Sequence, residues 1–191
     1  MSDKCSTCSM NGSCDTGECQ TRLPPGILSE YDLSTPVADG IAVWLELSGD
    51  RIRTTSLEAV SKAREMNTGR VFGIVFGDGG KRSVYSEAFE HGIDSLYHVR
   101  SPELNTFDPD AYGNSIKKLM NSIFPAVLFI PMTDDGLLLS ETLSNRYGMT
   151  VVPFGHDQNG GSYPKIMLIR KGEFKAVFEK GRKGTVFNIM P

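Results

Sequence analysis

Between residues 40 and 154, short apolar runs alternate with amphipathic segments, and this alternation constrains the fold more than any other feature of the sequence. Apolar runs bounded by turn residues predict strands, and apolar residues at helical spacing predict helices. Strands and helices that alternate along a chain build a parallel sheet covered by helices. The predicted strands are 41–47, 71–76, 95–99, 126–131 and 150–154, and the predicted helices are 56–66 with Ser56 as N-cap, 83–90, 108–124 and 136–147.

The pattern changes at 156–164, which predicts a polar, glycine-rich loop. Three short apolar runs follow, at 165–170, 174–179 and 185–189. Lys171-Gly172 and Lys180-Gly181 lie between these runs, as turns between antiparallel strands do. We therefore expect an α/β fold with an open, mostly parallel sheet flanked by helices, adenine-nucleotide-hydrolase-like or Rossmann-like, with a C-terminal antiparallel meander. In such sheets ligands bind outside the carboxyl ends of the strands.

Composition excludes several classes of protein. Twenty Lys+Arg against 23 Asp+Glu give a net charge of -3, so the chain offers no basic field for a nucleic acid. The longest apolar runs, such as 126–132, are far shorter than the roughly 20 residues of a membrane helix, and the N-terminus lacks the pattern of a signal peptide. We expect a cytoplasmic protein with no nucleic-acid partner and no membrane insertion.

All four cysteines, Cys5, Cys8, Cys14 and Cys19, lie in the first tenth of the chain. The segment 1–26 has few apolar side chains and cannot order itself around a core. The four thiols, at the spacing C-x2-C-x5-C-x4-C, supply the complete ligand set of an iron-sulfur cluster or of a tetrahedral zinc site. The spacing matches neither the ferredoxin runs nor paired zinc knuckles, so it predicts a metal site on these cysteines without identifying the metal. Free thiols in an unstructured tail are the alternative.

A series of segments from residue 40 to residue 191 follows a recognisable order and spacing. They are VWLELSGDRI, which holds Glu46 and Gly49, SLEAVSKAREM, VFGIVFGDG, HGIDSLYHV, FDPDAYGNSIKKLMN, FPAVLFIPMTDDGLLLSETLSNRYG and KAVFEKGRKGTVFNIMP. The series resembles the N-terminal domain of the electron transfer flavoprotein α subunit. We therefore divide the chain into a Cys-rich tail at 1–26, a linker at 27–39, and an α/β domain similar to that family at 40–191.

The resemblance implies an electron-transfer-associated protein, a carrier or binding subunit rather than an enzyme, that pairs with a β-like or flavin-bearing partner. In the family, a second domain of the α subunit holds most FAD contacts, and we expect this chain to lack it. The related domain of the β subunit holds AMP or a second FAD, so the resemblance implies FAD or AMP only through a partner or weakly. The sequence departs from the family at Leu137, where Arg is usual, and at Glu141, where Pro is common. The four-cysteine tail is not part of the usual pattern, and an iron-sulfur cluster on it, if that is the metal it binds, would serve as a one-electron relay.

Two turns that follow predicted strands form a candidate nucleotide site. Backbone N–H groups at such positions bind phosphates in related folds. This makes an adenine-nucleotide-binding or sensing module the first alternative function. Its cofactor-binding residues would be Gly77, Asp78, Gly79, Thr133 and Gly136.

Other conspicuous residues receive structural interpretations. Asp134 and Asp135 would repel a phosphate, and Asp135 or Thr133 is expected to cap the following helix. Trp44 lies inside the first predicted strand and is expected in the core. The histidines are scattered along the chain and are expected at the surface or in loops, at His91, His98 and His156.

The second alternative function is an iron-sulfur scaffold or adaptor. The run of Cys5, Cys8 and Cys14 also resembles the N-terminal cysteine segment of cytosolic iron-sulfur scaffold ATPases. However, Gly77 to Ser83 does not have the spacing of a Walker A motif, and it predicts a turn after a strand. A scaffold would transfer its cluster to another protein, whereas a relay would keep it and pass electrons.

Overall fold

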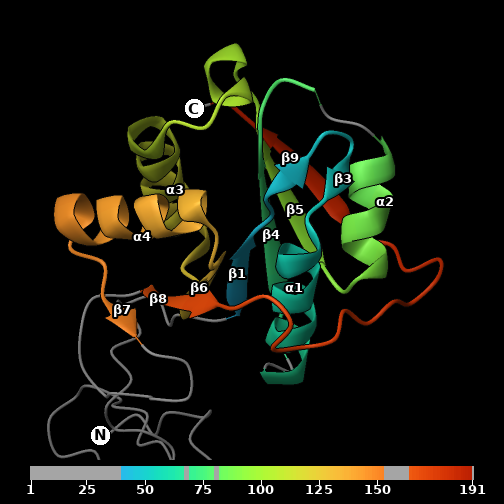
Figure 1. Ribbon diagram of the computed structural model, residues 1–191. Helices are drawn as coiled ribbons and strands as arrows, with labels where there is room; N and C mark the ends of the chain where they lie inside the picture. The colour runs from blue at the N-terminus through green and yellow to red at the C-terminus, as the bar shows by residue number, and fades with distance from the viewer. Residues whose placement is uncertain (1–39, 67–68, 80–81, 153–163, 191) are drawn as a thin grey trace, which may run out of the picture. The chain divides into compact units, whose positions relative to one another are not determined.

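The computed structural model describes residues 40–66, 69–79, 82–152 and 164–190 (Figure 1). The described residues form a seven-stranded sheet of order β7-β8-β6-β1-β4-β5-β9, in which all neighbouring strands are parallel. The strands are β1 (Ile41–Trp44), β4 (Val71–Phe76), β5 (Ser95–Val99), β6 (Val127–Pro131), β7 (Val151–Val152), β8 (Lys165–Ile169) and β9 (Thr185–Ile189). The prediction of an open parallel α/β sheet is confirmed. The predictions for the four cysteines and for His156 lie outside the described residues.

Helices cover both faces of the sheet, as Figure 1 shows. The helices are α1 (Thr54–Met66) and α2 (Arg82–Glu90) on one face and α3 (Pro109–Ile123) and α4 (Asp134–Tyr147) on the other, with a 3-10 turn, η1 (Pro102–Asn105), before α3. The central strands are buried on both sides, so successive residues of β1 enter different cores: Val43 joins the α1 and α2 side, and Trp44 joins the α3 and α4 side. No helix among these residues has the length and apolar character needed to cross a membrane.

Local sequence explains where the helices begin. The Asp108 carboxylate accepts hydrogen bonds from the N–H groups of Asp110 and Ala111, both at 2.9 Å, and Pro109 occupies the first turn of the helix predicted at 108–124. Thr133 caps α4, as one of the two predicted candidates. The N-cap prediction for Ser56 is wrong, because α1 begins two residues earlier and the Ser56 hydroxyl instead accepts from the N–H of Glu46 at 3.0 Å.

A small hairpin interrupts the predicted first strand. β1 ends at Trp44, and the antiparallel pair β2 (Leu47–Ser48) and β3 (Arg51–Ile52) follows it. Gly49, with φ of 61°, supplies the left-handed conformation that the turn requires. The hairpin stands at the carboxyl end of β1, where parallel sheets bind ligands.

The predicted C-terminal antiparallel meander is wrong. β8 pairs in parallel with β6, and β9 pairs in parallel with β5 at the other side of the sheet. Residues 174–179 form no strand. β8 and β9 lie at opposite sides of the sheet, so no hairpin can join them, and the glycines of the two predicted turns, Gly172 and Gly181, bend one long connection instead.

This connection, residues 170–184, runs over α1 and α2 and is here named the strap (Figure 1). Side chains of α1 satisfy its backbone: the N–H of Gly172 donates to Glu58 Oε2 and the N–H of Val177 donates to Ser61 Oγ, both at 2.7 Å. Side chains of α1 therefore accept the backbone hydrogen bonds that a neighbouring strand would have accepted in the predicted meander.

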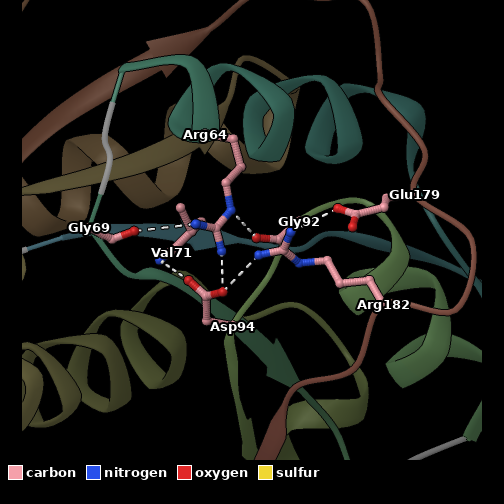
Figure 2. Close-up of polar contacts among 7 residues, drawn as sticks. All are labelled: Arg64, Gly69, Val71, Gly92, Asp94, Glu179 and Arg182. Carbon is pink, nitrogen blue, oxygen red and sulfur yellow. Dashed lines mark hydrogen bonds and ion pairs between the residues drawn. The ribbon is translucent and has the colours of Figure 1, made fainter.

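The end of the strap is held by an ionic cluster (Figure 2). Asp94, in the turn before β5, pairs with Arg64 of α1 and accepts from Arg182 Nη2 at 3.0 Å and from the N–H of Val71 at 2.9 Å. Arg182 also pairs with Glu179 at 2.8 Å. The cluster joins α1, β4, β5 and the strap, and it lies at the amino ends of the strands, away from the ligand edge.

Candidate functional site

A cleft of about 420 Å³ opens at the carboxyl ends of β1 and β4. The β2-β3 hairpin and the η1 turn form parts of its rim. The residues that line it are Trp44, Leu45, Glu46, Leu47, Gly49, Asp50, Arg53, Phe76, Gly77, Gly79, Leu104, Asn105, Phe107, Tyr112 and Asp135. Both its position and its volume are typical of ligand sites in α/β folds.

Four aromatic residues form one wall of the cleft. Tyr112 lies at the centre, with its ring centroid 4.2 Å from that of Phe76, 5.1 Å from that of Phe107 and 6.1 Å from that of Trp44. The Tyr112 hydroxyl donates to the Leu104 carbonyl at 2.9 Å. Burial, with a smaller contribution from Asp135, raises the pKa of Tyr112 to about 12, so the wall is uncharged at neutral pH. Trp44 is 3% exposed, as expected for a core residue, although it also borders the cleft.

Glu46 provides a buried carboxylate in the cleft lining. Its side chain is only 7% exposed, and Oε1 pairs with Arg53 Nε at 3.0 Å. The Glu46 backbone is fixed at both ends, since its N–H donates to Ser56 Oγ and its carbonyl accepts from the N–H of Arg53 at 2.8 Å. Among the described residues, Glu46 Oε2 has no hydrogen-bond partner of good geometry. The position of the carboxylate is therefore fixed by Arg53 and by the backbone hydrogen bonds of Glu46.

Burial raises the pKa of the Glu46 carboxyl because the charged form loses hydration. The nearby Thr133 hydroxyl and the Arg53 guanidinium offset part of this effect, and the negative charge of Asp135 adds to it. A bound cation would favour the ionised form and bring the pKa back down.

The predicted turn Gly77 to Gly79 lies at the cleft, and its hydrogen bonds are largely internal. The N–H of Gly77 donates to the Val99 carbonyl at 3.2 Å, and the N–H of Asp78 donates to Asn105 Oδ1 at 2.7 Å. Gly77 and Gly79 line the cleft. These two N–H groups are thus committed to the protein and are not free to bind a phosphate.

The second predicted turn, Thr133 to Gly136, lies at the same edge of the sheet, after β6. The N–H of Gly136 donates to Thr133 Oγ1 at 3.0 Å. A Cβ atom on Gly136 would lie 1.9 Å from the Pro131 carbonyl oxygen, so packing alone requires glycine here. Of this segment only Asp135 is in the cleft lining. The structure brings Gly77, Gly79 and Asp135 to one cleft and leaves Asp78, Thr133 and Gly136 outside its lining.

Sequence reasoning missed the buried role of His98, which was expected at the surface or in a loop. Its side chain is fully buried in β5, where Nε2 lies 2.8 Å from the Gly77 carbonyl and Nδ1 lies 2.6 Å from the Tyr85 hydroxyl. A carbonyl only accepts, so Nε2 carries a proton. In the neutral ring, Nδ1 then accepts from the Tyr85 hydroxyl. Burial lowers the pKa of His98, which agrees with this neutral form. His98 thereby supports Gly77 at the cleft.

The described residues contain no group of three or more His, Cys, Asp or Glu side chains placed to hold a metal ion. Glu46 and the aromatic wall were not predicted as site residues. An acid directly after a buried strand, as in WLEL, is the signal that could have identified Glu46.

Comparison with known proteins assigns the fold to a family. A family model described as "Electron transfer flavoprotein domain" matches residues 42–154, more than half of the chain. The LctC subunit of "Lactate dehydrogenase (NAD(+),ferredoxin)" from Acetobacterium woodii is 22% identical over 137 residues. This alignment covers 68% of the present chain and 32% of LctC, so the chain spans about a third of the length of that relative.

Proposed function

The chain belongs to the electron transfer flavoprotein domain family, and from this premise we propose that it is an α-subunit-like binding component of an electron-transfer flavoprotein assembly. The observation that carries the proposal is the family match at 42–154, which runs from β1 to β7 and includes the cleft. In this proposal the flavin chemistry belongs to a β-like or flavin-bearing partner, and the present chain supplies a docking and positioning domain rather than an enzyme. The name of the relative LctC places that protein in a ferredoxin-linked dehydrogenase, a setting in which such a component has a use.

Exposed apolar side chains on the described surface support a protein partner. Met132, Leu137 and Leu138 surround the start of α4, with 40%, 41% and 50% of their surfaces exposed. Large apolar side chains grouped on one segment are typical of interaction sites. Leu137 stands where the family usually has Arg, so the partner surface facing it would be apolar rather than acidic.

The tail cysteines complete the proposal as an electron relay. A polypeptide has no redox group of its own at a useful potential, so electron transfer needs a cofactor. Cys5, Cys8, Cys14 and Cys19 provide four thiolates, the donor set of an iron-sulfur cluster, which would supply one-electron chemistry when bound.

Anaerobic purification of the full chain tests the relay. We expect iron and acid-labile sulfide with a visible charge-transfer spectrum, and loss of all three in a variant with Cys5, Cys8, Cys14 and Cys19 changed to Ser. Zinc, or no metal, in the unaltered chain would remove the relay from the proposal and leave the binding component.

Co-purification tests the partner. A tagged full chain should capture a protein that carries FAD, identified by mass spectrometry as β-like or as a flavin domain. The double substitution L137E/L138E should abolish capture, whereas the Glu141→Gln substitution, on an exposed residue one turn further along α4, should leave it intact. Absence of any captured flavoprotein would refute the proposed function.

A further inference from the structure

The strap exposes two neighbouring large apolar side chains. Val177 is 63% exposed and Phe178 is 57% exposed, and Ala176 beside them is exposed as well. The Phe178 ring contacts His91, with the ring centroids 5.6 Å apart, but more than half of Phe178 stays in solvent. Scattered apolar residues are normal at a surface, whereas adjacent large ones are typical of an interaction site. This part of the strap is therefore a candidate docking segment.

The backbone that carries these side chains is fixed to the helices below it. The N–H of Val177 donates to Ser61 Oγ of α1 at 2.7 Å, and the N–H of Glu179 donates to the Glu90 carbonyl of α2, also at 2.7 Å. A segment that is ordered before binding loses little conformational entropy on binding. The strap therefore presents its apolar side chains on a preformed surface.

The same stretch has unused backbone donors. The bonded N–H groups of Val177 and Glu179 are two residues apart, which is the period at which an extended chain repeats its direction. The alternate N–H groups, of Ala176 and Phe178, have no hydrogen-bond partner among the described residues. An extended segment of another protein, laid along the strap, could accept from these donors, as when a peptide adds a strand to a sheet edge.

The strap is basic although the protein as a whole is acidic. Residues 170–184 contain six Lys and Arg residues and two Glu residues, whereas the whole chain has a net charge of -3. Arg182 uses its charge within the fold, in ion pairs with Asp94 and Glu179. Four exposed lysines of the strap have no ion-pair partner in the described part of the chain: Lys171, Lys175, Lys180 and Lys183. Carboxylates on a partner would complement this charge.

A cleft of about 530 Å³ lies beside the exposed stretch. Its lining includes Phe174 and Val177 of the strap and Lys62 of α1, together with further Lys, Arg and Glu side chains. The Lys62 ammonium lies 4.9 Å from the centroid of the Phe174 ring. Side chains that anchor one protein on another are typically held in such recesses. The cleft therefore gives a partner a place to insert one side chain next to the strap.

We propose that the strap is a docking site for an extended, acidic segment of a protein partner. The partner backbone accepts from the N–H groups of Ala176 and Phe178, its apolar side chains cover Val177 and Phe178, and its carboxylates face the four unpaired lysines. An anionic membrane shares the charge but lacks the acceptors, because hydrocarbon that covered Phe178 would leave these N–H groups without hydrogen bonds.

This site goes beyond the proposed function and does not depend on it. The flavin-bearing partner would bind at the start of α4, whereas the strap runs over α1 and α2 on the opposite face of the sheet (Figure 1). The test below uses only the chain and synthetic probes. Its failure is therefore distinguishable from a failure to capture a flavoprotein.

Peptide titration of the full chain tests the site. The probes are the end-blocked peptides EEVFVEE and EELYLEE, and the controls are KKVFVKK and KKLYLKK, which keep the apolar centres and reverse the charge. Amide NMR spectra report the strap residue by residue. We expect saturable shifts within 170–184 with an acidic peptide and none with the basic peptides. The N–H groups of Ala176 and Phe178 should also exchange more slowly with solvent in the complex.

The alternatives are outcomes of the same titration. No saturation by either acidic peptide up to about 2 mM, or equal binding of the basic peptides, would overturn the proposal. Vesicles of phosphatidylglycerol and a single-stranded oligothymidylate are added in parallel. Stronger binding to the vesicles or to the oligonucleotide would overturn it in favour of a membrane or a nucleic acid.

Substitutions establish the role of the unpaired lysines. The double substitution K175E/K180E should weaken binding of the acidic peptide by at least about tenfold, because attraction is replaced by repulsion. The control K117E/K118E makes the same change of charge on α3, away from the strap, and should alter binding by less than about twofold. Phe178→Ser should also weaken binding, since it removes half of the apolar centre. Unchanged binding in a folded K175E/K180E protein would refute the assignment.

Discussion

Arg182 and Asp94 are 88 positions apart in sequence and joined by a hydrogen bond of 3.0 Å between Nη2 and Oδ1. Asp94 also pairs with Arg64 and accepts from the N–H of Val71, so one carboxylate holds α1, β4 and the strap (Figure 2). Burial alone would raise the pKa of Asp94, but the hydrogen bonds from Arg64, Val71 and Arg182 outweigh it and the pKa is lowered. The ionised carboxylate is therefore part of the folded state.

Replacing Asp94 by Asn should lower the free energy of unfolding by roughly 2 kcal/mol at neutral pH. A lowered folded-state pKa means that this stabilisation is present above the ordinary Asp pKa and is lost as the pH falls through the folded value. Urea denaturation across the acid range should show this loss in the unaltered chain and a flatter profile in the variant. Asp110→Asn breaks an exposed pair with Arg146 and should cost less than about 1 kcal/mol. Equal losses in the two variants would contradict the role of Asp94.

His98 should remain neutral with the proton on Nε2, because burial lowers its pKa and both ring nitrogens have partners. Protonation is easier in the unfolded chain, so stability should decline as the pH drops below about 6.5. Nitrogen NMR shifts of the ring identify the tautomer directly. Tyr85→Phe removes only the hydroxyl partner and should cost about 1 kcal/mol. A His98 ring that titrates near the ordinary histidine pKa in the folded protein would contradict the assignment.

Two glycines predicted as site residues should respond differently to alanine. Gly136→Ala places a Cβ 1.9 Å from the Pro131 carbonyl oxygen, and we expect a loss of about 3 kcal/mol or failure to fold. Gly79→Ala meets no atom within 4 Å and should change stability by less than about 1 kcal/mol. Thermal melts of the pair measure the contrast. A folded and fully stable Gly136→Ala protein would show that the start of α4 can shift.

The strap should loosen when its anchors on α1 are removed. Ser61→Ala deletes the acceptor of the Val177 N–H and should cost about 1 kcal/mol. Hydrogen exchange followed by mass spectrometry should show faster exchange in 170–184 while β4 keeps its protection. Ser122→Ala is the control, because that hydroxyl is exposed and bonds only within α3. Uniform loss of protection across the chain would instead indicate that the strap and the sheet unfold together.

Sequence patterns predicted the parallel sheet because each strand and helix carries its own periodicity. The predicted strand 71–76 is reproduced as β4, and Asp108 caps α3 through hydrogen bonds to nearby N–H groups. The prediction of an antiparallel meander after Gly155 was wrong because β5 and β9 are about 90 residues apart in sequence. No local pattern near 185–189 indicates that they pair. A Lys-Gly pair favours a bend in the backbone whether the bend belongs to a hairpin or to a long connection such as the strap, so these pairs could not distinguish the two.

The two turns predicted as a nucleotide site lie at the carboxyl edge of the sheet, where the cleft opens, because this edge follows from parallel topology. The residues that give it chemical character could not be identified in the same way. Glu46 depends on the β2-β3 hairpin that places Arg53 beside it, and the aromatic wall combines Trp44 of β1 with Tyr112 of α3. His98 lies in β5, to which β9 is added about 90 residues later in the sequence, and its side-chain partners, Tyr85 and Gly77, belong to other elements.

That addition sets an order of events during synthesis. β5 is complete at Val99, but the strand that covers its outer edge begins only at Thr185. Until the ribosome has released that strand, the nascent chain presents β5 as an open edge, a template for wrong pairing with other chains. Interrupting translation within the strap should therefore yield an aggregation-prone intermediate, one that needs a chaperone on β5 until β9 arrives.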